Sequence, residues 1–166
     1  FEEQLRKRNI PYRIYGGLSF YQRKEIKDLI AYFRLTANPA DDESFKRVVN
    51  YPARGIGKTT MDRLTLAAVK HDCSLWDVLQ DPFKKPEDLK GAAWGKLQDF
   101  SVMMSGFATR LETASAFDLG DHIAQHTNLL RELHKDKTPE GVARYENIQE
   151  LLAGMKEFSD ATDPAN

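Results

Sequence analysis

The sequence contains a single cysteine, Cys73, among its 166 residues. One cysteine excludes an internal disulfide and favours a reducing compartment. No apolar run approaches the ~20 residues that a membrane-spanning helix needs, and no secretory signal is visible at the N-terminus. We therefore expect a protein without a membrane partner, with enough residues for one domain that has its own core.

A large net charge is also missing, because 24 Lys and Arg nearly balance 25 Asp and Glu. The balance hides an asymmetry along the chain. Residues 1–60 carry 12 basic and 7 acidic side chains, a net +5, whereas residues 61–166 carry 12 and 18, a net −6. A basic first third suits a polyanionic partner, although an unevenly charged solvated surface gives the same numbers.

Residues spaced for catalysis are absent as well. The sequence shows no Ser-His-Asp arrangement and no pair of carboxylates that its pattern brings together. His122 and His126 are four residues apart and could share a helix face, but a metal needs further ligands, which nothing nearby supplies. We therefore predict no catalytic residue, no cofactor and no metal site in this chain.

Apolar spacing predicts helices along almost the whole chain. The clearest spans residues 21–37, where a capping box of Ser19 and Gln22 precedes one continuous apolar face, made of Ile26, Leu29, Ile30 and Phe33. Further helices are expected at about residues 41–50, 59–71, 74–80, 91–114 and 118–133, and from Pro139 onward. The expected caps are Asp41 or Asp42 for the first of these, Ser74 with Asp77 for the third, and Thr138 for the last. The single strand candidate, residues 12–15, has no partner with which to form a sheet.

These patterns predict a mainly all-α fold. We expect a helical bundle-like domain over residues 19–166, preceded by a short α/β remnant over residues 1–18. The first residue is Phe1 rather than Met, and it lies inside an amphipathic pattern. This start indicates a piece of a longer protein.

The stretch YPARGIGKTT, residues 51–60, ends like the phosphate-binding loop of an ATPase. Such a loop requires G-x-x-x-x-G-K-[ST] after a buried strand. Here the first required glycine is replaced by Pro52, and the preceding FKRVVN has helical spacing. The stretch therefore does not predict an ATP site.

A turn between two helices explains the same residues better. Both glycines can adopt positive φ, and Ile56 would anchor the turn in the core. A helix that begins at Lys58 would direct its free N–H groups and its positive dipole end outward, toward a phosphate. The pattern predicts a helix-hairpin-helix (GIG) element that binds the DNA backbone without reading bases. The predicted DNA-binding residues are Arg54, Gly55, Ile56, Gly57, Lys58, Thr59 and Thr60. A plain glycine turn between helices fits the local sequence equally well.

Several segments, in a fixed order, resemble a known family. IPYRIYGG, FYQRKEIKDLIAYFRL, NPADDESFKRVVNYP and RGIG follow one another from residue 10, and RYENIQELL spans residues 144–152. Together they resemble the 2B subdomain of UvrD, PcrA and Rep type superfamily 1 DNA helicases. Between about residues 66 and 143 the likeness is mainly a helical layout.

The resemblance implies a role inside a larger enzyme. Residues 1–18 would end the second motor domain (2A), and residues 19–166 would be a helical insertion that contacts duplex or junction DNA and swivels to regulate unwinding. The parent protein would be a bacterial, cytoplasmic helicase of 3′ to 5′ polarity, active in DNA repair or replication. It would use ATP and Mg²⁺ bound outside this chain, so the chain alone would have no catalytic activity.

Two functional hypotheses stay open. In the first, the chain is a DNA-contacting regulatory subdomain of an ATP-dependent helicase. In the second, it is a protein-interaction module of the same helicase, which docks repair or transcription proteins through its acidic later part, with incidental DNA contact. An independent enzyme has no supporting set of residues.

Overall fold

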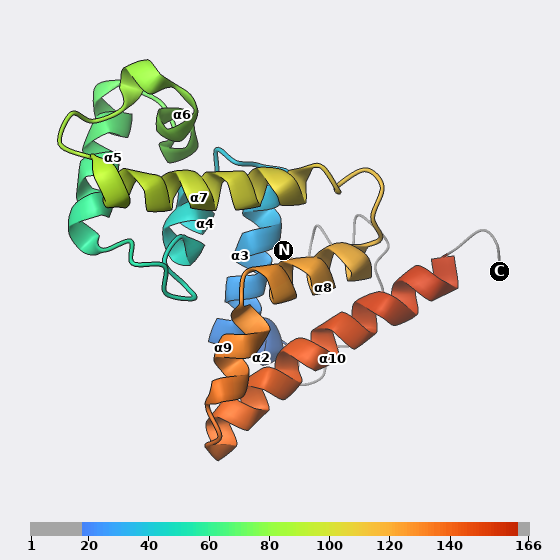
Figure 1. Cartoon of the computed structure of the whole chain (residues 1–166). Helices are drawn as coiled ribbons and strands as arrows, with labels where there is room; N and C mark the ends of the chain where they lie inside the picture. The colour runs from blue at the N-terminus through green and yellow to red at the C-terminus, as the bar shows by residue number, and fades with distance from the viewer. Residues whose placement is uncertain (1–17, 163–166) are drawn as a thin grey trace. The chain divides into compact units, whose positions relative to one another are not determined.

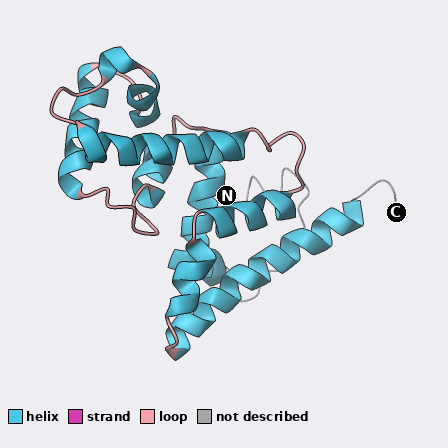
Figure 2. Ribbon diagram, in the orientation of Figure 1, coloured by secondary structure: helices cyan, strands magenta, loops and turns pink. Residues whose placement is uncertain are grey.

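The computed structural model describes residues 18–162, and every regular element in this range is a helix (Figures 1 and 2). The predicted mainly all-α fold is confirmed. The strand expected at residues 12–15 lies outside the described residues, as does all but the last residue of the expected remnant. None of the described helices is both long and apolar enough to cross a membrane.

The chain forms two compact units. Among the described residues, the first comprises residues 18–29 and 113–162, and the second comprises residues 30–112. The helix α3 (Lys24–Ala37) contributes its first residues to the first unit and the others to the second.

The second unit contains α4 (Asp42–Val48), α5 (Lys58–Lys70), α6 (Leu75–Gln80), the short 3-10 helix η1 (Pro82–Lys84) and α7 (Gly91–Ala108). Within it, α6 packs against α4, α5 and α7 (Figure 1). The rings of Phe45 and Phe100 meet edge to face, with their centres 5.4 Å apart. The largest side chains of this core are fully buried, and they include Tyr32, Phe45, Leu64, Leu75, Leu97 and Phe100.

Polar caps begin two helices of this unit where the sequence predicts them. The Asp41 carboxylate accepts the N–H of Ser44 at 3.0 Å and caps α4. Ser74 and Asp77 form a capping box at the start of α6. Each cap supplies a partner for an N–H group that the helix itself leaves unpaired.

The first unit contains α2 (Leu18–Tyr21), α8 (Ala116–His126), α9 (Leu129–Lys135) and α10 (Pro139–Thr162). The long helix α10 packs along α8 and α9 (Figure 1). Thr138 caps it as predicted, because its hydroxyl accepts the N–H of Gly141 at 3.1 Å. The core of this unit includes Leu119, Ile123, Leu129, Ile148 and Leu152.

Three helix boundaries differ from the sequence predictions. Ser19 lies within α2, whose Phe20 is buried, so it is not the cap of α3, which begins at Lys24. The helix α7 ends at Ala108 and not near residue 114. The helix expected over residues 118–133 is interrupted, because Asn128 adopts a φ of +64° between α8 and α9. Asparagine tolerates this left-handed conformation better than most residues do.

The buried face of α3 is wider than its periodicity predicts. Ile26, Leu29 and Ile30 are buried as expected, whereas Phe33 is only half-buried. Tyr32, which lies outside the predicted face, is fully buried and reaches the segment after α4. This contact makes α3 part of the support for that segment.

Candidate nucleic-acid interface

The glycine loop, residues 49–57 between α4 and α5, contains the first four predicted binding residues, and the other three begin α5. Gly55 has a φ of +73°, in the left-handed region that glycine adopts most readily. Ile56 is 2% exposed, so it anchors the loop in the core as predicted. Because α5 begins at Lys58, the predicted start of this helix is also confirmed.

The prediction of positive φ is wrong for Gly57. Its φ of −86° and ψ of 178° are extended values that any residue can adopt. A Cβ built on Gly57 would meet no atom within 4 Å. The position is therefore open to an approaching ligand, and a side chain there would occupy that approach.

The first turn of α5 is accessible. Gly57, the residue that caps α5, provides no side-chain hydrogen bond, so the first N–H groups and the positive end of the helix dipole face outward. Lys58 and Thr59 are exposed and Thr60 is half-buried. The Lys58 ammonium lies 3.5 Å from the Asp62 carboxylate in an exposed pair. Exposed pairs contribute little free energy, so Lys58 can exchange Asp62 for another anion.

Arg54 points into the protein. Its Nη1 donates hydrogen bonds to the carbonyl oxygens of Val48 at 2.7 Å and Val49 at 3.1 Å. Its Nη2 donates to the Tyr32 hydroxyl, and its guanidinium carbon lies 5.2 Å from the centre of the Phe100 ring. Carbonyl groups at the end of a helix carry partial negative charge, which favours a cation there. These contacts make Arg54 a residue that positions the glycine loop.

Asn50 also holds the loop, although sequence reasoning did not select it. Its side-chain oxygen accepts the N–H of Arg54 at 2.8 Å and the N–H of Ile56 at 3.1 Å. Asparagine commonly bonds nearby backbone in turns, so its place just before the loop was a weak signal. The contact of the Tyr32 hydroxyl with the Tyr51 carbonyl, at 2.6 Å, had no local signal, because it joins residues from different elements.

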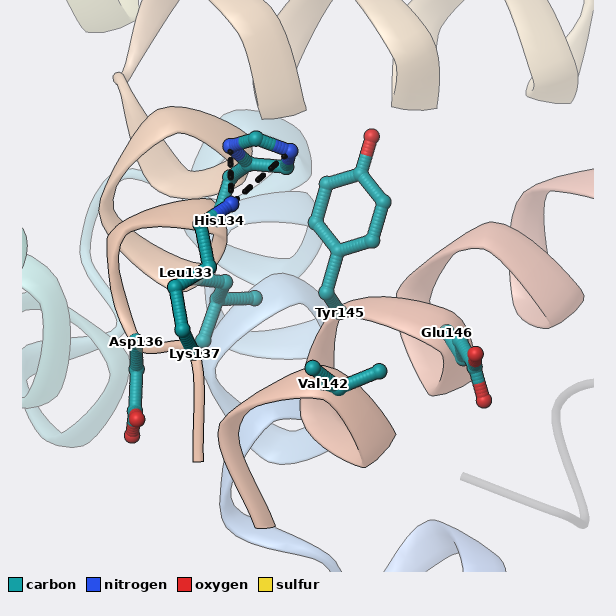
Figure 3. A pocket seen from close by; sticks show the side chains of 7 residues that line it. All are labelled: Leu133, His134, Asp136, Lys137, Val142, Tyr145 and Glu146. Atoms are coloured by element: carbon teal, nitrogen blue, oxygen red, sulfur yellow. Dashed lines mark hydrogen bonds between the residues drawn. The ribbon is translucent and has the colours of Figure 1, made fainter. Parts of the chain in front are cut away.

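A hollow lies in the first unit where α9 meets α10 (Figure 3). Lys137 Nζ lies 3.1 and 3.3 Å from the two ring nitrogens of His134, whose ring meets Tyr145 edge to face. Hydrogen bonds from the Thr138 hydroxyl and N–H lower the pKa of Asp136. These contacts support the connection between the helices. The residues that line the hollow are Leu133, His134, Asp136, Lys137, Val142, Tyr145 and Glu146.

The two spaced histidines lie together on α8. The rings of His122 and His126 have centres 3.8 Å apart, and His126 Nδ1 lies 2.9 Å from the His122 carbonyl oxygen. In the range 18–162, no group of three or more His, Cys, Asp or Glu side chains could hold a metal ion.

The segment RYENIQELL contributes side-chain hydrogen bonds within the first unit. Asn147 donates a hydrogen bond to the Glu25 carboxylate at 2.8 Å and accepts one from Arg23 at 2.7 Å. Glu25 is 5% exposed, so its carboxylate depends on such partners. The segment that carried part of the resemblance therefore joins α10 to the start of α3.

Known proteins resemble this chain along at least 95% of its length. Residues 1–166 match the family described as UvrD-like helicase C-terminal domain. The chain is 35% identical to DNA helicase II of Salmonella typhimurium over 158 residues, which are 95% of the chain and 22% of that protein. It is 36% identical to DNA helicase II of Haemophilus influenzae over 157 residues, 95% of the chain and 22% of that protein. It is 35% identical to ATP-dependent DNA helicase PcrA of Bacillus subtilis over 162 residues, 98% of the chain and 22% of that protein.

The matched part is 22% of the length of each of these three curated relatives. The match to the family, in contrast, covers every residue of the chain. The chain belongs to the UvrD-like helicase C-terminal domain family.

Proposed function

We propose that this chain is the DNA-contacting regulatory subdomain, 2B, of an ATP-dependent DNA helicase. The family match and relatives named DNA helicase II and ATP-dependent DNA helicase PcrA support this function. In this proposal residues 1–18 end the motor domain 2A and residues 19–166 form the 2B subdomain. ATP and Mg²⁺ bind elsewhere in the longer protein, which unwinds DNA 3′ to 5′ in repair or replication in the bacterial cytoplasm.

The observation that supports the proposal most is the start of α5, which is accessible and follows a loop that is anchored in the core. Ile56 and Arg54 attach the loop to the core, whereas Gly57 and Lys58 face outward. The free N–H groups, the helix dipole and the ammonium of Lys58 suit a phosphate oxygen. Because phosphates are the same in every sequence, the element would grip duplex or junction DNA as a helix-hairpin-helix without base specificity.

The predicted binding residues have different tasks in this proposal. Gly55 forms the turn, and Ile56 and Arg54 hold it in place. Gly57 leaves space for the DNA backbone, and Lys58 supplies charge. The hydroxyls of Thr59 and Thr60 are donors for phosphate oxygens.

Substitution of Gly57 tests the proposal. Gly57→Val should weaken duplex binding more than Lys58→Ala does. Valine fills the space over the helix start, whereas loss of the lysine removes only one charge. Lys58→Ala should mainly reduce the slope of log K against log salt, by about one unit at most. Binding is measured by fluorescence anisotropy with a labelled DNA junction.

Circular dichroism provides the control, because Gly57→Val should retain its helix content: its Cβ meets no protein atom. Wild-type junction affinity in folded Gly57→Val would contradict the proposal. The loop would then be structural, and protein docking would become the better explanation.

Exposed apolar side chains favour protein docking as the second candidate function. In the second unit Phe83 is 94% exposed, and Leu66, Val69 and Val102 are also largely exposed. Leu66 and Val69 are three residues apart on α5, so they lie on the same face of this helix, and exposed apolar patches mark interaction sites. On this hypothesis the chain binds repair or transcription proteins, and Leu66→Ser with Val69→Ser abolishes that binding without changing affinity for DNA.

A further inference from the structure

We propose that Lys96 of α7 is an additional phosphate-binding residue, which acts with Lys58 on the backbone of duplex DNA. The inference rests on the proposed function of the glycine loop. It adds a cation from a separate helix of the same unit, which the local pattern around residues 51–60 did not indicate.

The side chain of Lys96 lies directly beside Gly55. A Cβ placed on Gly55 would lie 2.8 Å from Nζ of Lys96 and 3.2 Å from its Cε. The end of the lysine therefore crosses the space that a side chain at position 55 would fill. The absence of a side chain on Gly55 thus permits both the turn and the approach of this ammonium.

Core packing of α7 places Lys96 there. Phe100 follows Lys96 by four residues, so the two side chains share a face of α7. Phe100 is 1% exposed and contacts both the Phe45 ring and the Arg54 guanidinium. Because Arg54 directly precedes Gly55, one face of α7 reaches both residues, through Phe100 and through Lys96. Packing of Phe100 therefore places this face of α7, and with it Lys96, beside the loop.

The charge of Lys96 has no structural use in the second unit. Lys96 is exposed, and in the part of the chain that the structure describes it takes part in no ion pair or hydrogen bond. With Arg54 behind the loop and Lys58 at its end, Lys96 brings a third positive charge to this segment. The Asp62 carboxylate offsets part of the Lys58 charge, and the positive charges that remain favour a polyanion.

The ligand that fits is a backbone phosphate. A lysine ammonium is a compact charge with three donors, which can bind a phosphate oxygen from many directions. Lys96 should therefore raise affinity for any duplex sequence to the same extent.

A salt titration of duplex binding tests Lys96 against a matched control. The control is Lys70, which is exposed at the far end of α5, about 18 Å from Lys58 at 1.5 Å per residue. Lys96→Gln should lower affinity roughly eightfold at 0.1 M salt and reduce the magnitude of the slope of log K against log salt by about one. Lys70→Gln should change neither quantity, and Lys96→Arg should restore both.

Gly57→Val separates this inference from the proposed function. If the wild-type chain does not bind duplex DNA, or if Gly57→Val binds it as the wild type does, the proposed function and the role of Lys96 are both overturned. If Gly57→Val weakens binding but Lys96→Gln matches Lys70→Gln in affinity and slope, the loop function stands and the role of Lys96 is overturned. A loss in Lys96→Gln that Lys96→Arg does not restore also overturns it, because a phosphate contact requires only the charge.

Discussion

Gly55 and Gly57 flank the same isoleucine, yet the backbone uses them differently. Gly55 has positive φ and lies against Lys96, whereas Gly57 is extended and faces open space. A residue with a Cβ in the left-handed region costs about 1–2 kcal/mol. A side chain at the first position therefore lowers stability, whereas the backbone at the second position can accept any residue.

Alanine substitutions should separate these two roles. Gly55→Ala should lower the free energy of unfolding by about 1–2 kcal/mol because of its backbone conformation, with a further cost for displacing the flexible end of Lys96. Gly57→Ala should be neutral, or stabilising by up to about 1 kcal/mol, since alanine restricts the unfolded chain. Urea denaturation measures both values, and equal losses would show that the loop conformation is misassigned.

At the scale of the element, α4 is stabilised at both ends, and its C-terminal end binds the glycine loop. Asp41 begins the helix by accepting hydrogen bonds from Ser44, and the carbonyls at its other end bind Arg54. The hydrogen bond from the Ser44 N–H, aided by its hydroxyl and by nearby Arg34, lowers the pKa of Asp41 below its ordinary value of 3.8. A carboxylate thus stabilises the start of this short helix, and a guanidinium stabilises its end.

The lowered pKa of Asp41 makes part of the stability dependent on pH. The ionised carboxylate is favoured in the folded state, so its contribution is fully present above the unfolded pKa and is lost as pH falls through the lower, folded pKa. Asp41→Ala should cost about 1 kcal/mol at neutral pH. Unfolding followed between pH 7 and pH 2 should show this difference shrinking below about pH 4. A difference that stays constant down to pH 2 would argue against the ionised cap.

For the whole molecule, the relation to longer relatives decides which activities to expect. The chain matches about a fifth of each helicase, and in it the GKT residues follow a loop and the helix α4, not a strand. In a phosphate-binding loop the backbone comes from a buried strand and curls around the phosphates. The glycine loop instead presents a helix start that is open to a large ligand.

The isolated chain should neither hydrolyse ATP nor bind it measurably. Titration calorimetry with Mg²⁺ and ATP is the measurement, and saturable binding would contradict this prediction. If the chain acts within a longer helicase as proposed, Gly57→Val in that protein should spare the ATPase activity that single-stranded DNA stimulates and should impair activity on substrates with a duplex ahead of the motor. A parallel loss of the stimulated ATPase would instead connect the loop to the motor.

The sequence by itself determined the features that depend on neighbours within a turn or two. Apolar periodicity located α3 and its buried Ile26 and Leu29, and cap residues located the starts of α4, α6 and α10. The burial of Ile56 and the start of α5 at Lys58 also followed from local pattern, because glycines and an isolated apolar residue restrict what a short loop can do.

The tertiary structure alone decided which distant side chains meet. It directed Arg54 inward to Tyr32 and Phe100, placed Lys96 beside Gly55, and paired Glu25 with Asn147. Each pair joins residues from different elements, and their approach depends on how whole helices pack. A local sequence pattern predicts the buried face and the ends of a helix. The partner of a charged side chain, in contrast, is determined by the balance between burial and hydrogen bonding across the folded unit.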